Sequence, residues 1–260
     1  MSQRIAVVTG ANRGIGRAIA VALAADGFAV AAAARDPAAL GDTAAEIEKA
    51  GGTAVPLVCD VQEEASVAAM AEQLTRADET LGPVHTVVAN AGTAGPTAPL
   101  HEITLDEWRA TLATDLDGVF LTFRAFVPGL IARRAGSLIA ISSMTGKRPL
   151  HGRTPYAAAK LGVIGLVRTL AVELGPHGIR VNAVCPGAVA GPRIDEVIRR
   201  QAAARGIGED EALAAFTGSS PLGRLVEADE VARACAFLAS DAAAAITGED
   251  LNVSAGAVMY

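Results

Sequence analysis

The sequence predicts a single α/β domain built on a doubly wound, mostly parallel sheet of about seven strands. Short apolar runs alternate with longer helical patterns along all 260 residues. The runs are apolar without strict polar alternation, which is typical of strands that helices cover on both faces. No linker, repeat or low-complexity stretch divides the chain. We therefore expect one domain over residues 1–260.

Strands are expected where apolar runs are bounded by Gly, Asn or Asp. Their ranges are 4–10, 28–34, 53–60, 84–90, 136–143, 179–185 and 249–254. Helical patterns between them are centred on 15–25, 38–50, 63–80, 104–133, 155–175 and 227–240. The segment 188–222 belongs to the one long connection without a strand, and connections of that length are usually functional. We expect it to form one or two helices that act as a substrate loop or lid.

Composition excludes several functional classes. The net charge of −6 is spread out with no basic block, which argues against a nucleic-acid partner. Three cysteines (Cys59, Cys185 and Cys235) lie far apart without metal-ligand spacing, so reduced core thiols and no metal site are expected. No run has the length of a membrane span, and the first residues lack the features of a signal peptide. These features predict a cytoplasmic protein without a membrane partner.

A glycine-rich loop follows the first predicted strand. In "VVTGANRGIGRAIA", Gly10, Gly14 and Gly16 lie between that strand and the first helix. Backbone N–H groups at a helix start attract anions, and glycine lets a pyrophosphate approach closely. The spacing differs from the usual Gly-x-Gly-x-x-Gly fingerprint, and a tight strand–helix turn is the alternative. Its place inside an alternating α/β pattern favours nucleotide binding.

The segment "TPYAAAK" places Tyr156 and Lys160 four residues apart. Pro155 suits a first helical position and alanine favours helix, so the two side chains should share one face. A cation beside a phenol favours the phenolate, which would make Tyr156 a proton donor usable near neutral pH. The alternative is an ordinary amphipathic helix whose lysine extends to solvent.

These motifs, with others in the same order, resemble the short-chain dehydrogenase/reductase family over almost the whole chain. The likeness rests on "TGANRGIG", "CDV" (59–61), "NAG" (90–92), "ISS" (141–143), "YAAAK" and "NAVCPG" (182–187). It implies a Rossmann-type fold that transfers hydride between a nicotinamide cofactor and a ketone or secondary alcohol. The cofactor-binding residues that we expect are Gly10, Asn12, Arg13, Gly14, Ile15, Gly16, Arg35, Asp60, Val61, Asn90, Ala91, Gly92, Tyr156, Lys160, Pro186, Gly187 and Val189.

The resemblance also implies catalytic roles. Tyr156 would be the general acid or base, Lys160 would favour its ionised form and bind the ribose, and Ser143 would polarise the substrate oxygen. Aligning "TDLDGVF" places Asp115 where the family usually has an asparagine. A carboxylate there would favour the charged form of Lys160, and we expect activity to survive. Two further departures are Gly191, in place of a common threonine, and a tail without the usual Asp-Gly-Gly.

The choice of cofactor depends on the end of the second strand. A carboxylate there selects NAD, whereas arginine accommodates the 2′-phosphate of NADP. The acidic position of the family falls on Ala34, and Arg35 follows it, with Arg13 able to reach the same phosphate. We expect NADP(H), although Asp36 could turn inward, and NAD(H) is not excluded.

The substrate is expected to be a small carbonyl or alcohol compound. Arg153 precedes the tyrosine and Arg193 lies in the predicted lid, so both could bind an anionic ketone. Ion pairing with Asp195 or Glu196, or plain exposure, is the alternative. Reduction of 3-oxoacyl thioesters is the commonest use of similar sequences.

Two other functional classes are less consistent with the motifs. A cofactor-binding sensor without turnover would not need Ser143, Tyr156 and Lys160 together. A hydrolase is not indicated either, because the sequence shows no Ser/His/Asp set with a nucleophile elbow. Family likeness also implies a homotetramer in which the helices of 104–133 and 155–175 are buried between subunits.

Overall fold

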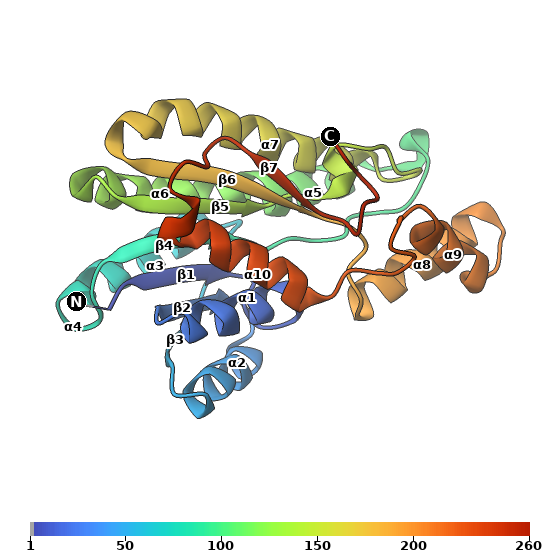
Figure 1. Ribbon diagram of the computed structural model, residues 1–260. Helices are drawn as coiled ribbons and strands as arrows, with labels where there is room; N and C mark the ends of the chain where they lie inside the picture. The colour runs from blue at the N-terminus through green and yellow to red at the C-terminus, as the bar shows by residue number, and fades with distance from the viewer. Residues whose placement is uncertain (1–2) are drawn as a thin grey trace.

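Seven parallel strands form one sheet in the order β3-β2-β1-β4-β5-β6-β7 (Figure 1). This computed structural model describes residues 3–260. The strands are β1 (Ile5–Thr9), β2 (Ala29–Ala34), β3 (Thr53–Val58), β4 (Val84–Ala89), β5 (Gly136–Ile141), β6 (Ile179–Pro186) and β7 (Asp250–Val253). Every strand pair is parallel, so all carboxyl ends lie at one edge. The doubly wound, Rossmann-type fold predicted from the sequence is confirmed.

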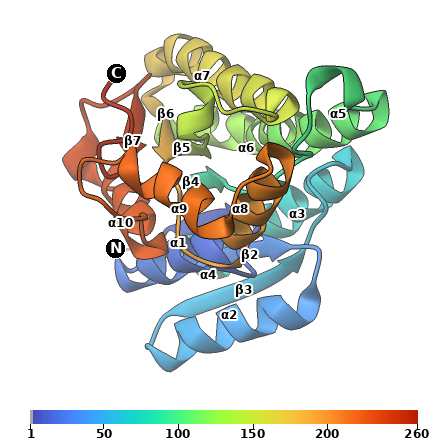
Figure 2. The ribbon, with the colours of Figure 1, turned by 90° about the vertical axis from the view of Figure 1, so that its right-hand side faces the viewer.

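Helices cover both faces of the sheet (Figure 2). The long ones are α1 (Gly14–Ala25), α2 (Pro37–Lys49), α3 (Glu64–Arg76), α6 (Gly118–Arg133), α7 (Thr154–Leu174) and α10 (Ala228–Ala239). Shorter segments are α4 (Asp78–Leu81), α5 (Leu105–Leu112), and the 3-10 turns η1 (Leu100–Glu102), η3 (Met144–Gly146), η4 (Gly175–His177) and η5 (Asp241–Ala243). Within residues 3–260, none of the helices combines the length and apolarity that a membrane span needs.

Each central strand contributes to two separate hydrophobic cores. Ile5 and Val7 of β1 pack with α3, α6 and α7, whereas Ala6 and Val8 pack with α1, α2 and α10. Side chains of a strand point alternately to opposite faces, which is why the apolar runs show no polar alternation. The three cysteines are free and buried, and burial raises the pKa of the Cys185 thiol to about 11. They are core residues, as expected.

The strand order reverses between β1 and β4, because β2 and β3 lie on one side and β5 to β7 on the other. Ligands of open α/β sheets bind in the crevice outside the carboxyl ends at such a point. The loops after β1, β4, β5 and β6 contain the glycine-rich, "NAG", "ISS" and "CPG" motifs. The topology therefore brings the predicted site residues to one edge of the sheet.

The expected helix over 104–133 contains an irregular turn. Residues Ala113–Asp117 form a single π-helical turn, η2, between α5 and α6. Such turns are rare and occur frequently at functional sites. The expected helix over 63–80 is also divided, because the chain bends at Ala77 between α3 and α4.

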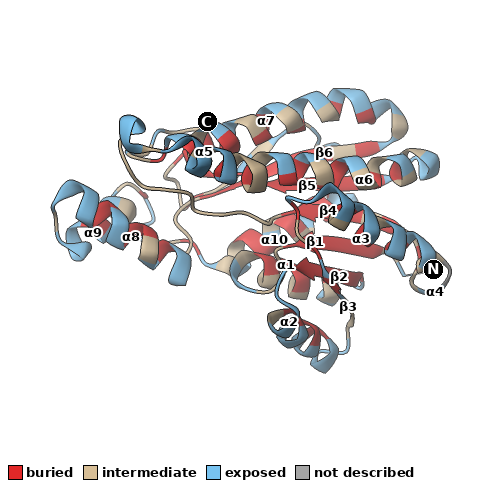
Figure 3. Ribbon diagram, turned by 180° about the vertical axis from the view of Figure 1, so that it is seen from behind, coloured by how far each residue is buried: buried red, intermediate tan, exposed pale blue. Residues whose placement is uncertain are grey.

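The predicted lid contains two helices, α8 (Pro192–Arg205) and α9 (Glu209–Gly218). They extend beyond the carboxyl edge of the sheet (Figure 1), and both are largely exposed on their outer surfaces (Figure 3). Their buried residues form a third, small apolar cluster, made of Ile194, Val197, Ile198, Ala202 and Ala212. The segment enters and leaves at one place, where Val189 and Val226 form an isolated parallel bridge.

Candidate active site

Tyr156 and Lys160 lie on one face of the first turns of α7. Helix α7 has Pro155 in its first turn, as the sequence predicts. The Lys160 Nζ atom lies 5.7 Å from the centroid of the Tyr156 ring. Tyr156 is partly exposed, whereas Lys160 is buried. A reactant can therefore reach the phenol while the cation beside it stays shielded from water.

Two groups hold the Lys160 ammonium in place. Its Nζ donates a hydrogen bond to the backbone oxygen of Ile141 at 2.9 Å and lies 3.3 Å from Oδ1 of Asp115. The Ser142 hydroxyl also donates to the backbone oxygen of Lys160 at 2.8 Å. Strand β5 and the residue after it therefore fix both the backbone and the charge of the lysine.

Asp115 lies in the π-helical turn and is fully buried. Its Oδ1 accepts a hydrogen bond from the backbone N–H of Thr93 at 3.1 Å, while Oδ2 has no hydrogen-bond partner among the described residues. A Cβ atom at Gly92 would lie 2.4 Å from Oδ1. Gly92 is thus required for this close approach, and the "NAG" turn is joined to the lysine through Asp115.

Ser143 follows β5 and faces the same edge of the sheet. Its Oγ accepts a hydrogen bond from the backbone N–H of Thr145 at 3.1 Å, in an extended backbone conformation. That bond uses the hydroxyl as an acceptor and leaves its proton free to be donated. A neighbouring glycine, Gly146, packs directly on the backbone of α7, where a Cβ would lie 2.8 Å from the carbonyl carbon of Lys160.

The glycine loop has the backbone geometry of an anion site. Gly10 and Gly14 both have positive φ angles, of 66° and 55°. Helix α1 begins at Gly14, and no side chain caps its N-terminal N–H groups. A Cβ atom at Gly16 would lie 2.1 Å from the Gly10 carbonyl oxygen, so only glycine permits this turn. Uncapped donors at a helix start fit the pyrophosphate of a dinucleotide.

The loop after β4 is joined to the glycine loop. Asn90 donates from Nδ2 to the backbone oxygens of Thr9 at 2.9 Å and Gly10 at 3.3 Å. Thr9 in turn accepts at Oγ1 from the N–H groups of Asn90 and Ala91. Asn90 therefore positions the loop and has its amide donor engaged by protein.

The remaining predicted cofactor residues border the same edge. Asp60 and Val61 follow β3, and Asp60 accepts at Oδ1 from the N–H of Gln62 at 3.0 Å. Pro186 ends β6, and Gly187 lies against Ser254, where a Cβ would be 2.9 Å from Cα. Asn12 and Ile15 lie in the glycine loop and at the start of α1, and Val189 forms the bridge at the base of the lid.

The end of β2 presents a positive charge. Arg35 is 72% exposed, and its guanidinium lies 3.7 Å from Asp60. Asp36 accepts from the N–H groups of Ala38 and Ala39, and it therefore caps α2. Arg13 is exposed at the N-cap of α1. The Asp36 carboxylate is thus used to cap α2, while the side chains of Arg35 and Arg13 remain accessible.

The two arginines predicted for the substrate differ in their surroundings. Arg153 is buried, with Cζ 4.8 Å from the Tyr156 ring centroid, and it donates to the backbone oxygen of Ala94. Burial lowers the pKa of the Arg153 guanidinium. Arg193 is exposed at the start of α8. Glu196 pairs with Arg200 one turn further along α8 and is therefore not the partner of Arg193.

Comparison of the sequence with known proteins shows to which family the chain belongs. A family model described as enoyl-(acyl carrier protein) reductase matches residues 10–258. The chain belongs to the short-chain dehydrogenase/reductase family. It is 39% identical to the granaticin polyketide synthase putative ketoacyl reductase 1 of Streptomyces violaceoruber, over 98% of this chain and 93% of that protein.

Solved structures of short-chain dehydrogenases agree with this assignment. A single-residue variant of actinorhodin polyketide ketoreductase, with NADPH, has a TM-score of 0.93 at 35% identity, covering 99% of this chain and 98% of that one. The NAD+-bound xylitol dehydrogenase has a TM-score of 0.93 at 28% identity, covering 97% of this chain and 98% of that one. The chain is therefore an oxidoreductase of the short-chain family.

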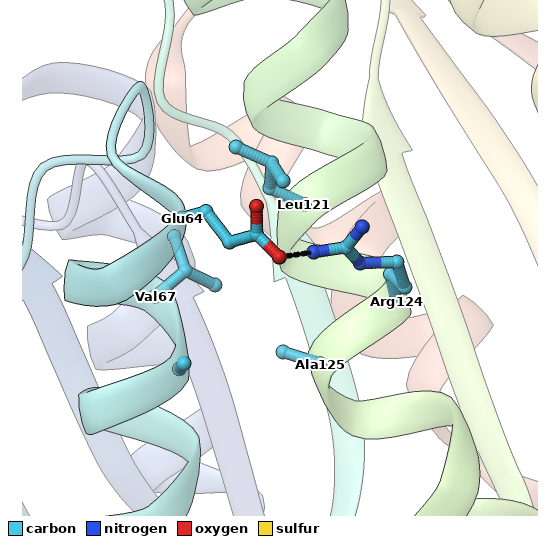
Figure 4. Close-up of a pocket in the computed structure, with 6 residues that line it drawn as sticks. Glu64, Val67, Leu121, Arg124 and Ala125 are labelled. Carbon is cyan, nitrogen blue, oxygen red and sulfur yellow. Dashed lines mark hydrogen bonds and ion pairs between the residues drawn. The ribbon is translucent and has the colours of Figure 1, made fainter.

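A separate hollow lies between α3 and α6 (Figure 4). Glu64 and Arg124 form an ion pair across it. Its lining consists of Glu64, Val67, Ala68, Leu121, Arg124 and Ala125. None of these is a predicted site residue of this short-chain dehydrogenase, and the hollow contributes no group to the site described above.

Sequence reasoning missed three groups that build the site. They are the backbone oxygen of Ile141, the backbone N–H of Thr93 and the Ser142 hydroxyl. The two backbone groups leave no signal in side-chain identity. Ser142 was detectable, because a second hydroxyl directly before Ser143 on a buried strand needs a hydrogen-bond partner.

Proposed function

We propose that this chain is an NADP(H)-dependent ketoreductase in which Tyr156 is the general acid. The observation that supports it most directly is the pairing of a reachable phenol with a shielded ammonium, 5.7 Å from the ring. Ser143 lies at the same sheet edge with its hydroxyl proton free. Together they form a proton donor and a hydrogen-bond donor suited to one carbonyl oxygen.

The glycine loop and Lys160 would hold a nicotinamide cofactor at this edge, and that cofactor would supply a hydride for the carbonyl carbon. Ser143 donates a hydrogen bond to the carbonyl oxygen and stabilises the charge that develops there. Tyr156 transfers its phenolic proton to that oxygen, and the product is a secondary alcohol. Lys160 stabilises the tyrosinate that remains. In the opposite direction Tyr156 takes the hydroxyl proton.

We propose NADP(H) as the preferred cofactor. Arg35 and Arg13 are accessible at the end of β2 and at the start of α1, where they could bind a 2′-phosphate. Asp36 is engaged as the cap of α2, which supports the same choice. The similarity to both an NADPH-bound and an NAD+-bound structure keeps NAD(H) as the competing cofactor.

For the substrate we propose a 3-oxoacyl thioester or another ketone bearing an anionic group. The ketoacyl reductase relative supports the first class. Arg193, exposed at the start of the lid, supports an anion, because guanidinium binds carboxylate, sulfonate and phosphate by paired hydrogen bonds. Arg153 borders the same region and is the second arginine that the sequence assigns to this role.

We further propose a homotetramer formed through α6 and α7. Large apolar side chains are exposed on these helices: Phe120 is 46%, Leu161 58% and Val172 79% exposed. Burying such side chains between subunits is favourable. Sedimentation of the chain at micromolar concentration tests this assembly, and a monomer would contradict it.

The proposed activity is tested by NADPH oxidation against a panel of ketones that are neutral or bear carboxylate, sulfonate or thioester groups. Tyr156→Phe should lower turnover by roughly 10²–10⁴-fold while NADPH binding persists. Tyr260→Phe is the matched control, because it removes the same hydroxyl from an exposed ring that contacts neither Lys160 nor Arg153, and it should leave turnover unchanged. NADPH binding without turnover of any ketone or alcohol would favour a cofactor sensor instead.

A further inference from the structure

Arg153 is a buried charge without a carboxylate partner. Its side chain lies between α7 and the loop after β4, and the residue is only 3% exposed. Among residues 3–260 no aspartate or glutamate forms an ion pair with it, although a buried charge normally requires one. One of its guanidinium nitrogens donates to the Ala94 carbonyl, and its Nε has no partner in the described chain.

The charged groups around Arg153 and Tyr156 come from three elements. Lys160 lies on α7, Asp115 on the π-helical turn, and Arg193 and Arg200 on α8. Of these, Asp115 is the carboxylate whose charge acts on Arg153, and it is paired with Lys160. The positive charge of Lys160 is therefore largely balanced before it can act on the tyrosine.

Arg153 is placed to act on Tyr156 together with that balanced charge. Its Cζ lies 4.8 Å from the ring centroid, closer than the 5.7 Å of the Lys160 Nζ. While Tyr156 is neutral, Lys160, Asp115 and Arg153 carry a net charge of +1. When Tyr156 ionises, the sum becomes zero. The buried guanidinium thus gains an anionic neighbour only in the state that follows proton transfer, and such an interaction lowers the barrier.

We propose that Arg153 is a positioning residue that stabilises the tyrosinate of Tyr156 and supplies the positive charge that Asp115 cancels at Lys160. Arg153 touches the ring of the catalytic tyrosine and not the reacting atoms. Its guanidinium also keeps its proton at any pH at which an enzyme works. The tyrosine therefore has two cations, one balanced by a carboxylate and one not.

The chain permits a direct measurement, because it contains only two tyrosines, Tyr156 and Tyr260. In a Tyr260→Phe background, the ultraviolet absorbance of tyrosinate reports on Tyr156 alone. This titration needs neither substrate nor turnover. The inference rests on the proposed function only for the role of Tyr156, so a failure of the ketoreductase assay and a failure of the titration are distinguishable.

Four proteins in that background form a double-mutant cycle. Arg153→Gln, which keeps a donor for Ala94, should move the ionisation of Tyr156 to higher pH. Asp115→Asn, which frees the charge of Lys160, should move it lower. The double variant should titrate near the parent. In alcohol oxidation, the acidic limb of the pH–rate profile should move in the same directions.

Two controls and one alternative variant separate this role from a merely structural one. Arg153→Lys should restore the parental titration, because it restores the charge. Arg76→Gln removes an exposed arginine of α3 and should leave the titration unchanged. Arg153→Met, which fills similar space, replaces Arg153→Gln if the latter does not fold, as judged by circular dichroism. A parental titration in a folded Arg153→Gln or Arg153→Met protein would overturn the proposal.

Discussion

Lys160 and Asp115 form an ion pair inside the protein, with Nζ 3.3 Å from Oδ1 and side chains that are 4% and 0% exposed. A buried pair of this kind contributes little net stability when intact, but removing one partner leaves an uncompensated charge. The pair joins the π-helical turn to α7, and so it connects two of the elements that frame the tyrosine.

The first prediction concerns this pair. Asp115→Ala should lower the free energy of unfolding by about 3–5 kcal/mol, because Lys160 loses its counter-charge in a buried site. Asp115→Asn also removes the counter-charge but keeps an oxygen that can accept from the N–H of Thr93, so it should cost less by the penalty of leaving that donor unpaired, about 1–3 kcal/mol. Urea unfolding of both variants makes the comparison. If both variants lose the same free energy of unfolding, the hydrogen bond that residue 115 accepts from Thr93 does not contribute to stability.

A second prediction concerns the glycine loop. Gly16→Ala places a Cβ 2.1 Å from the Gly10 oxygen and 2.5 Å from Nδ2 of Asn90, so the loop must shift. NADPH affinity, measured by fluorescence titration, should fall at least about tenfold, equivalent to roughly 1.4 kcal/mol. Gly41→Ala in α2 is the control, because a Cβ there meets nothing within 4 Å. Unchanged affinity in the Gly16 variant would show that the loop does not bind the cofactor.

The third prediction distinguishes the two cofactors. Arg35→Ala should weaken NADPH binding about tenfold, since a charge-assisted hydrogen bond contributes about 1.5–3 kcal/mol and this side chain is largely solvated. NADH binding should not change, because NADH lacks the 2′-phosphate. Arg76→Ala, an exposed arginine paired with Glu72, is the control. If both cofactors lose affinity equally, Arg35 does not select between them.

The fourth prediction concerns pH and His85. Burial, with Arg4 nearby, lowers the pKa of His85 to about 4. Arg4 donates to Nε2 at 3.3 Å, so Nδ1 carries the ring proton and donates to Oγ1 of Thr86 at 3.0 Å. Between about pH 6.5, the ordinary histidine pKa, and about pH 4, His85 binds a second ring proton in the unfolded chain but not in the folded protein. Stability should therefore fall as the pH drops through that window.

Urea unfolding at about pH 7 and about pH 5 measures this loss. His85→Gln should show a smaller drop between the two pH values, because glutamine can still accept from Arg4 but does not titrate. His101→Gln, at an exposed position, should keep the parental drop. An identical drop in the His85 variant would assign the acid sensitivity to other groups.

The sequence was most informative where physical demands fall on side chains. Buried strands need apolar residues on both faces, and so all seven strands were located, with ends that differ by a few residues. Gly10 and Gly16 were identifiable because only glycine allows the positive φ of the first and the close contact of the second. Helical periodicity predicted that Tyr156 and Lys160, four residues apart, share one face of the helix.

The features that sequence could not predict depend on tertiary contacts. The π-helical turn at Ala113–Asp117 inserts one residue into a helix whose apolar pattern reads as continuous. The family resemblance placed Asp115 near Lys160, but the contact of its Oδ1 with the lysine depends on the geometry of that turn. The sequence assigns Arg153 to the substrate, and its contact with the Tyr156 ring depends on how the loop after β4 packs against α7.

The bridge between Val189 and Val226 closes the base of the segment between them, so that this segment can vary in length. The N–H of Ala190 donates to the Val226 oxygen, and the N–H of Val226 donates to the Ala188 oxygen, both at 2.8 Å. The residues between the two bridge positions thus form a closed excursion, and the buried members of its apolar cluster all come from within it. Lengthening such an excursion costs little, about 0.6 kcal/mol for each doubling. The length and sequence of this segment can therefore change while the elements that hold Tyr156 and Lys160 keep their places.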